Sequence, residues 1–168
     1  MIPLKLFAAT LAFFLLAALA PAGAAVLPVD QAFRVSGRLG EDGQITVRLR
    51  VAPGHYLYQD KLRFSAEPAG VTLGAPRLPP GQEIDDEFFG RVRIYRGEVE
   101  ARFAVQRLPP GAAGLTLVVR FQGCADAGVC YTPREQRLSL ERGRPETAVM
   151  RPAPGPVTDA LREPALAR

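Results

Sequence analysis

The chain has two cysteines, and their spacing defines the chemistry considered first. Cys124 and Cys130 lie in the segment FQGCADAGVCYTPRE with five residues between them. Such a pair can form a structural disulfide, contribute to a metal site, or exchange electrons with another protein. A disulfide here closes a loop of about seven residues, worth roughly 2.4 kcal/mol by loop entropy. It is poorly placed as a core staple, whereas an exposed pair in a hairpin-like excursion after Phe121 suits exchange.

A metal site is disfavoured by the number of available ligands. Zinc takes four protein ligands, or three plus water. The chain has a single histidine, His55, and the acid nearest the cysteines is Asp126. That spacing matches no familiar site, and His55 in APGHYLY is expected to be a surface or turn histidine. We therefore predict no metal and no cofactor apart from the cysteine pair.

The residues around the cysteines do little to activate a thiol. Lys, Arg and His are absent between them, and no helix N-terminus is evident. Asp126, if close, would disfavour the thiolate. We therefore expect a pair that reacts slowly with small oxidants and reductants and depends on an activated thiol of a partner. The alternative is a binding or interaction module with an inert structural disulfide.

A second group of residues joins acids to two adjacent aromatics. The segment reads Asp85, Asp86, Glu87, Phe88, Phe89 and Gly90. Neighbouring residues in a strand point to opposite faces, so Phe88 or Phe89 is expected to project from a loop. The residues alone do not separate a lid or partner contact from a lone exposed aromatic.

The elements that must position these groups are predicted to be strands. Gln44–Val51 alternates apolar and polar residues, and the segments 98–105 and 115–121 do the same. Weaker strands are predicted at 32–39, 56–64, 91–95 and 136–140. Period-two runs separated by Pro- and Gly-rich turns are typical of antiparallel sheets covered on one side. About seven such strands predict an all-β sandwich.

The two ends of the chain are expected to lie outside this domain. Residues 1–24 resemble a secretory signal peptide, with Lys5, an apolar run from residue 6 to residue 20, and small residues before a cut after Ala24. An uncleaved membrane anchor is the alternative, but a run of about 15 residues is short for a span of roughly 20. We predict a domain over 25–142 and a flexible Pro-rich tail over 143–168.

Charge and hydropathy disfavour two kinds of partner for the exported domain, nucleic acids and the membrane interior. The arginines are scattered along strands rather than clustered with aromatics, although the net charge is +4. This pattern disfavours nucleic-acid binding. No segment after the signal peptide is long enough to cross a membrane, so we expect a soluble protein of the periplasm.

Three segments together resemble a known family. FQGCADAGVCYTPRE, HYLYQDKLRF and DDEFFGRVRIYRGEV are similar to segments of the N-terminal periplasmic domain of the thiol–disulfide interchange protein DsbD, over about residues 27 to 140. The resemblance implies an immunoglobulin-like β-sandwich with the cysteine pair in an inserted hairpin. It also implies a relay of reducing equivalents from a thioredoxin-like donor to exported thiol proteins, such as disulfide isomerases and cytochrome c maturation factors.

The same resemblance implies roles for individual residues. Cys130 would form mixed disulfides with partners, and Cys124 would resolve them. Tyr56 and Tyr58 would match tyrosines close to the active site, and Asp126 and Tyr131 beside the cysteines are also expected near it. A cap loop with Phe88 as the ring that shields the disulfide would comprise Asp86, Glu87, Phe88, Phe89 and Gly90. In the family a membrane domain and a thioredoxin-like domain follow, so a sequence ending at Arg168 is expected to be a stand-alone version or an incomplete copy.

Overall fold

The computed structural model describes residues 26–146. The predicted signal peptide and all but the first residues of the predicted tail lie outside this range. Within it, strands dominate, and the exceptions are one helical turn, α2 (Val29–Ala32), and one 3-10 turn, η2 (Gln59–Lys61). None of the described helices is long and apolar enough to span a membrane.

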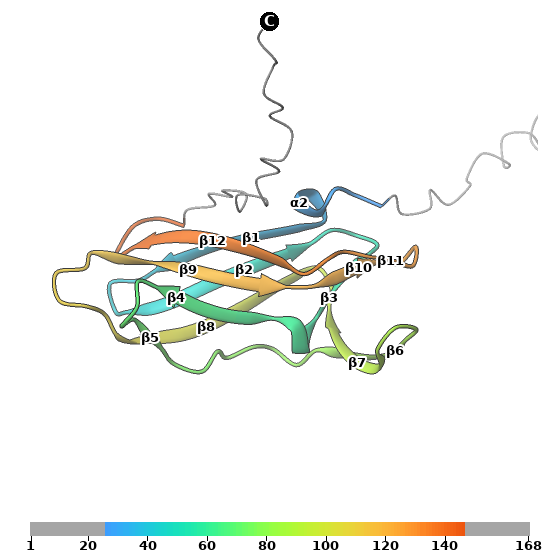
Figure 1. Cartoon of the computed structure of the whole chain (residues 1–168), viewed down its shortest axis with the longest axis horizontal. Coiled ribbons are helices and arrows are strands. Elements are labelled where there is room, and N and C mark those ends of the chain that lie inside the picture. The colour runs from blue at the N-terminus through green and yellow to red at the C-terminus, as the bar shows by residue number, and fades with distance from the viewer. Residues whose placement is uncertain (1–25, 147–168) are drawn as a thin grey trace, which may run out of the picture.

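Two antiparallel sheets form the body of the domain (Figure 1). The first has the strand order β1-β2-β8-β5, with β1 (Phe33–Leu39), β2 (Gln44–Val51), β8 (Glu98–Arg107) and β5 (Thr72–Leu73). The second has the order β12-β9-β4, with β12 (Arg134–Glu141), β9 (Gly114–Phe121) and β4 (Arg63–Glu67). Their inward-facing residues meet in one main core, as in a β-sandwich.

A third antiparallel sheet lies at one end of the sandwich, on the right in Figure 1. Its order is β11-β10-β3-β7-β6, with β11 (Val129–Cys130), β10 (Gly123–Ala125), β3 (His55–Tyr58), β7 (Gly90–Tyr95) and β6 (Gln82–Asp86). β9 reaches this sheet directly, because only Gln122 separates it from β10. The cysteine segment and the acidic–aromatic segment, far apart in sequence, therefore belong to one sheet.

The fold class predicted from the alternating pattern is confirmed: the domain is all-β, antiparallel and immunoglobulin-like. In β2 the residues Ile45, Val47 and Leu49 are buried, as the period of two requires. The single strand predicted over 56–64 is wrong. The chain turns through η2 there, so β3 joins the end sheet and β4 pairs with β9 in the sandwich.

The core has two parts. The main cluster fills the sandwich and includes Phe33, Leu117 and Phe121. A smaller cluster at the end sheet consists of Tyr56, Tyr58, Ile94 and Cys124, with Ile84, Val92 and Cys130 packed against it. Burying each large side chain contributes roughly 1.5–3 kcal/mol to stability. The smaller cluster therefore helps to stabilise the end sheet around the cysteines.

The start of the predicted tail lies on the first sheet. The Glu146 carboxylate accepts a hydrogen bond from the Ser36 hydroxyl and pairs with Arg48 Nη1 at 2.9 Å. These contacts hold Glu146 across β1 and β2. The chain leaves the described range from that face.

Candidate functional site

The two cysteines form a disulfide across the β10–β11 hairpin. Cys124 and Cys130 are directly opposite in the ladder, with Cα atoms 4.0 Å apart and sulfurs 2.05 Å apart. The intervening turn needs a glycine, because Gly128 has φ +78° and its N–H donates to the Ala125 carbonyl at 3.0 Å. A two-strand hairpin closed by its own disulfide therefore extends the end sheet.

The two cysteines differ in exposure. Cys124 is fully buried, whereas Cys130 is only partly buried. The expectation of an exposed pair is thus wrong for Cys124, because β10 also pairs with β3, where Tyr56 lies opposite Cys124. Gly123 allows this close approach. A Cβ added there would lie 2.2 Å from the Tyr56 carbonyl oxygen and 2.7 Å from the Phe33 ring.

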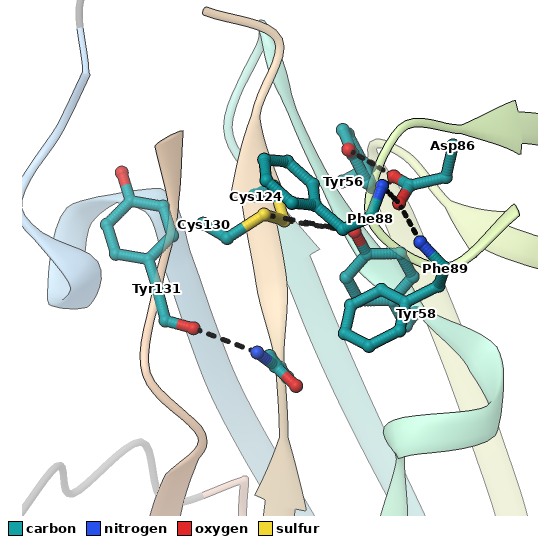
Figure 2. The surroundings of a disulfide bond; sticks show 9 residues. Tyr56, Tyr58, Asp86, Phe88, Phe89, Cys124, Cys130 and Tyr131 are labelled. Atoms are coloured by element: carbon teal, nitrogen blue, oxygen red, sulfur yellow. Dashed lines mark hydrogen bonds between the residues drawn. A yellow bond between two sulfur atoms is a disulfide. The ribbon is translucent and has the colours of Figure 1, made fainter. Parts of the chain in front are cut away.

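A buried carboxylate organises the side chains beside the disulfide (Figure 2). The Oδ2 atom of Asp86 accepts hydrogen bonds from the hydroxyls of Tyr56 and Tyr58, both at 2.8 Å. Its Oδ1 atom accepts from the backbone N–H groups of Phe88 at 2.9 Å and Phe89 at 3.0 Å. Asp86 sits at the end of β6 with only 8% of its surface exposed. Four donors therefore converge on one carboxylate.

Burial and hydrogen bonding shift the pKa values of Asp86, Tyr56 and Tyr58. Burial by itself would raise the pKa of Asp86, but the hydrogen bonds from both tyrosines and both amides outweigh it, so the pKa lies below its ordinary value. Burial, followed by hydrogen bonding to Tyr56 and Asp86, raises the pKa of Tyr58 far above that of a free tyrosine. Burial is also the largest cause of the raised pKa of Tyr56. At neutral pH the site holds one carboxylate and two neutral phenols.

Tyr58 connects this network to the sulfurs. Its hydroxyl oxygen lies 3.1 Å from Cys124 Sγ and 3.9 Å from Cys130 Sγ. Since the Tyr58 hydrogen goes to Asp86, the same oxygen is free to accept a hydrogen bond from Cys124 when that residue is a thiol. The arrangement therefore suits a protonated Cys124 after reduction.

The turn between β6 and β7 carries the predicted cap residues. Phe88 and Phe89 are 53% and 46% exposed, and Figure 2 shows the Phe88 ring pointing toward the disulfide. Phe89 packs edge-on against Tyr58 with ring centroids 5.1 Å apart, and Lys61 Nζ lies 4.8 Å from the Phe89 centroid. Both aromatics therefore project from the turn, but Phe89 is held between two neighbours.

The other two cap residues complete the turn. Gly90 is the first residue of β7 and has φ +68°. Glycine adopts this left-handed conformation without the steric cost that a side chain brings, which lets the chain reverse here. The Glu87 carboxylate reaches the cysteine hairpin: a Cβ added to Gly128 would lie 3.4 Å from its Oε1 atom. The cap turn and the hairpin turn are thus neighbours in space.

Tyr131 follows Cys130 but faces away from the network. Figure 2 shows it on the far side of Cys130 from Tyr58. Its ring packs on Phe33 with centroids 5.2 Å apart, and its hydroxyl donates to the Leu27 carbonyl at 2.6 Å. Tyr131 therefore anchors the chain just before α2 to the main core.

The expectation of a surface histidine at position 55 is wrong. His55 is 1% exposed, with Nδ1 3.0 Å from the Pro53 carbonyl oxygen and Nε2 3.1 Å from the Tyr131 hydroxyl. Its ring also meets the Phe33 ring edge-on at 6.0 Å. The turn before β3 folds His55 inward, where the Pro53 carbonyl accepts from its Nδ1–H and the backbone N–H of Leu27 donates to Nε2 at 3.5 Å.

Asp126 lies on the exposed hairpin turn and has a partner that the sequence did not indicate. Arg96 Nη1 lies 2.8 Å from Asp126 Oδ1, and its guanidinium stands 5.1 Å from the centre of the Tyr56 ring. Arg96 was missed because only the fold brings the β7–β8 turn to this hairpin. Across residues 26–146, no three His, Cys, Asp or Glu side chains gather as a metal-binding group.

A disulfide with one buried sulfur, beside a tyrosine–aspartate network and an aromatic turn, can be compared with known proteins. The family described as thiol:disulfide interchange protein DsbD, N-terminal, matches residues 23–142. The chain belongs to the DsbD N-terminal family. Family membership makes this a thiol:disulfide interchange domain with Cys124 and Cys130 as its cysteine pair.

Full-length relatives support the same assignment. The chain is 44% identical over 132 residues to thiol:disulfide interchange protein DsbD 2 of Pseudomonas aeruginosa, which covers 77% of this chain and 21% of the relative. It is 37% identical over 123 residues to DsbD of Cronobacter sakazakii, covering 73% of this chain and 20% of the relative. The matched region thus spans about a fifth of these relatives.

Solved structures agree in fold. The reduced DsbD N-terminal domain of Neisseria meningitidis matches with a TM-score of 0.63 and 35% identity, over 73% of this chain and 94% of that one. The complex between the DsbD and PilB N-terminal domains of the same organism gives a TM-score of 0.57 and 37% identity, over 68% of this chain and 86% of that one.

Proposed function

We propose that this domain relays reducing equivalents in the periplasm through a reversible Cys124–Cys130 disulfide. It accepts them from a thioredoxin-like donor and passes them to exported thiol proteins, such as disulfide isomerases and cytochrome c maturation factors. The observation that carries this proposal is the asymmetry of the bond, with Cys124 buried and Cys130 partly exposed beside an aromatic turn. The complex of a Neisseria relative with a PilB domain supports a protein partner.

Reduction begins at the accessible sulfur. A donor thiolate attacks Cys130 Sγ, the Cys124–Cys130 bond breaks, and Cys124 leaves as a thiolate that takes up a proton. The second donor thiol then attacks the donor sulfur of the mixed disulfide and releases Cys130. The donor dithiol becomes a disulfide, and two electrons and two protons pass to the cysteine pair.

Delivery reverses these steps. The Cys130 thiolate attacks the acceptor disulfide and forms a mixed disulfide with it. Cys124, deprotonated, then attacks Cys130 Sγ, which restores the internal bond and releases the acceptor as a dithiol. The buried position of Cys124, 4.0 Å from Cys130 between Cα atoms, suits a resolving group that no partner needs to reach.

The side chains around the sulfurs protect the reduced state. The Tyr58 hydroxyl donates its hydrogen bond to Asp86, so its oxygen is left to accept a hydrogen bond from the Cys124 thiol, and a thiol is a poor nucleophile. Phe88, pointing from the cap turn toward the disulfide, acts as a shield that a partner displaces. Small oxidants and reductants therefore react slowly.

An inert disulfide in an immunoglobulin-like interaction module is the competing function. The complete burial of Cys124 is the feature that favours it. The two functions differ in the reduction potential. A structural bond is expected below about −300 mV, and a relay bond above it.

Trapping of a mixed disulfide tests the relay. A thioredoxin-like protein with one active-site cysteine is activated as its thionitrobenzoate disulfide and mixed with the Cys124→Ala variant. Cys130 should displace thionitrobenzoate and form a stable cross-link. The released thionitrobenzoate is measured by its absorbance, and the cross-linked product appears as a larger band on a non-reducing gel.

The matched control is Cys130→Ala, which leaves only the buried Cys124. It should cross-link far more slowly, because a partner sulfur cannot approach a residue with no exposed surface. Absence of a cross-link with Cys124→Ala across several thioredoxin-like proteins would exclude the relay. Equal rates for both variants would remove the proposed roles of the two cysteines.

A further inference from the structure

Arg96 connects three segments that meet at the disulfide. It lies in the short turn between β7 and β8. Its Nη1 atom lies 2.8 Å and 3.0 Å from the two carboxylate oxygens of Asp126 and donates to the His55 carbonyl at 3.2 Å. One side chain therefore ties the β7–β8 turn to the first residue of β3 and to the cysteine hairpin.

The same guanidinium also contacts the network that holds the cap. It stands 5.1 Å from the centroid of the Tyr56 ring, a cation–π distance. The hydroxyl of that ring donates to Asp86, which in turn accepts the N–H groups of Phe88 and Phe89. Contacts therefore run without a break from the hairpin turn through Arg96 and Tyr56 to the cap turn.

The charge of Arg96 matters as well as its position. Asp126 is two residues from Cys124 and starts the turn that leads to Cys130. A carboxylate there disfavours a thiolate on the hairpin, and an arginine paired with it offsets that effect. Both side chains are partly exposed, at 40% and 43%, so the pair lies at the rim where a partner would approach.

We propose that Arg96 is a positioning residue for thiol–disulfide exchange, which clamps the hairpin turn and the Tyr56 ring and offsets the charge of Asp126. The inference rests on the proposed function for its relevance to partners. The contacts themselves, and the effect of the pair on the Cys130 thiol, do not depend on which protein is the partner.

Other charged and titratable groups face the cysteine hairpin, and they stay unchanged in the test. They come from β3, which pairs with the hairpin, and from the cap segment: His55, Tyr56, Tyr58, Asp86 and Glu87. Lys61 of η2 lies over the Phe89 ring of the cap. Asp86 carries a negative charge and accepts the hydrogen bond of the Tyr58 hydroxyl, which contacts Cys124 Sγ. Variants at Arg96 and Asp126 change no charge other than those of the rim pair.

The first measurement is the pH dependence of Cys130 alkylation by iodoacetamide, in the full chain carrying Cys124→Ala. Arg96→Met should raise the pH midpoint, and Asp126→Asn should lower it. Each change corresponds to about a twofold change in rate at fixed pH, as expected for one screened surface charge. The double variant should return near the starting midpoint, because both charges are gone.

The second measurement is the rate of mixed-disulfide formation with the activated thioredoxin-like protein. Arg96→Met should slow it by about three- to fivefold, since an ion pair and a cation–π contact are lost together. Adding Asp126→Asn should slow it no further, because the clamp is already broken. In the alkylation measurement, Arg96→Lys should keep the pH midpoint of the chain with native Arg96, since lysine carries the same charge.

A distant pair serves as the control. Arg120 and Glu135 form a comparable contact at 2.7 Å between β9 and β12, and Arg120→Met should leave both measurements unchanged. Unshifted midpoints in both single variants, or additive losses of cross-linking rate, would overturn the proposal. If Arg96→Met does not fold, the downward shift in Asp126→Asn still tests it. Cross-linking absent from the Cys124→Ala chain with native Arg96 would instead count against the proposed function.

Discussion

Replacing Asp86 with alanine removes the acceptor that holds the cap turn over the disulfide. Asp86 receives two backbone hydrogen bonds from the cap, at 2.9 Å and 3.0 Å, and two from tyrosine hydroxyls at 2.8 Å. The backbone pair decides whether the cap stays closed. At about 1 kcal/mol net for each bond, their loss weakens closure by about 2 kcal/mol.

That free energy converts into a rate. If dithiothreitol reaches Cys130 only when the cap is open, a loss of about 2 kcal/mol raises the open population, and hence the reduction rate, by about thirtyfold. Phe88 and Phe89 are half exposed, which places each bond toward the lower part of the usual range, so we expect about ten- to thirtyfold. Asp86→Asn keeps an acceptor oxygen for the two amides, and its NH2 group donates to the tyrosines. It should therefore accelerate reduction by only a fewfold.

The assay is timed reduction of the disulfide by dithiothreitol, quenched with acid and followed by alkylation and mass measurement of the two thiols. Asp85→Ala is the matched control, because Asp85 is the preceding residue in β6, is 87% exposed and carries the same charge. It should leave the rate nearly unchanged. A folded Asp86→Ala variant that is reduced at the unmodified rate would refute the reasoning that Asp86 holds the cap.

Three further predictions concern the shield, the close packing of the hairpin and the acid stability. Phe88→Ala should speed reduction by dithiothreitol, whereas an unchanged rate would show that the ring does not cover the sulfurs. Gly123→Ala should cost about 2–4 kcal/mol in urea unfolding, because its Cβ would lie 2.2 Å from the Tyr56 carbonyl oxygen. Gly97→Ala, at φ +66° with open space around it, should cost only about 1 kcal/mol. The folded pKa of Asp86 lies below its unfolded value of about 3.9, so its stabilisation is complete above that pH and is lost as the pH falls through the folded pKa. Asp86→Asn should therefore lose less stability between pH 7 and pH 3 than the unmodified chain; an equal loss would contradict this.

Much of the fold followed from local pattern. Alternation in β2, β8 and β9 predicted antiparallel strands because one face of each must be buried. The short strands β5, β6, β10 and β11 were not predicted, because two to five residues without clear alternation give no periodic signal. The break between β3 and β4 was missed although three polar residues, Gln59, Asp60 and Lys61, interrupt the apolar pattern there, because apolar and aromatic residues resume after them.

Part of the site was visible in the residues and part was not. Two adjacent phenylalanines predicted a projecting aromatic, since strand neighbours cannot share a face. The burial of Cys124 was hidden, because it depends on β10 pairing with β3, whose Tyr58 contacts Cys124 from 66 positions away in the sequence. Local sequence around the cysteines showed no activating base, but it also showed none of Tyr56, Tyr58 and Asp86, which the fold brings to the disulfide.

The sequence by itself determined the strand-forming pattern, the presence of one closely spaced cysteine pair and the acidic–aromatic segment, which begins at the end of β6. Only the tertiary structure decided that Tyr58, Asp86 and Cys124 meet, and that Arg96 pairs with Asp126. The physical reason is that strand alternation is a local property, whereas hydrogen bonds between β3, β6 and β10 depend on the order of strands in one sheet. A cysteine pair with no activating residues in its local sequence thus acquires an asymmetric environment from residues distant in the chain.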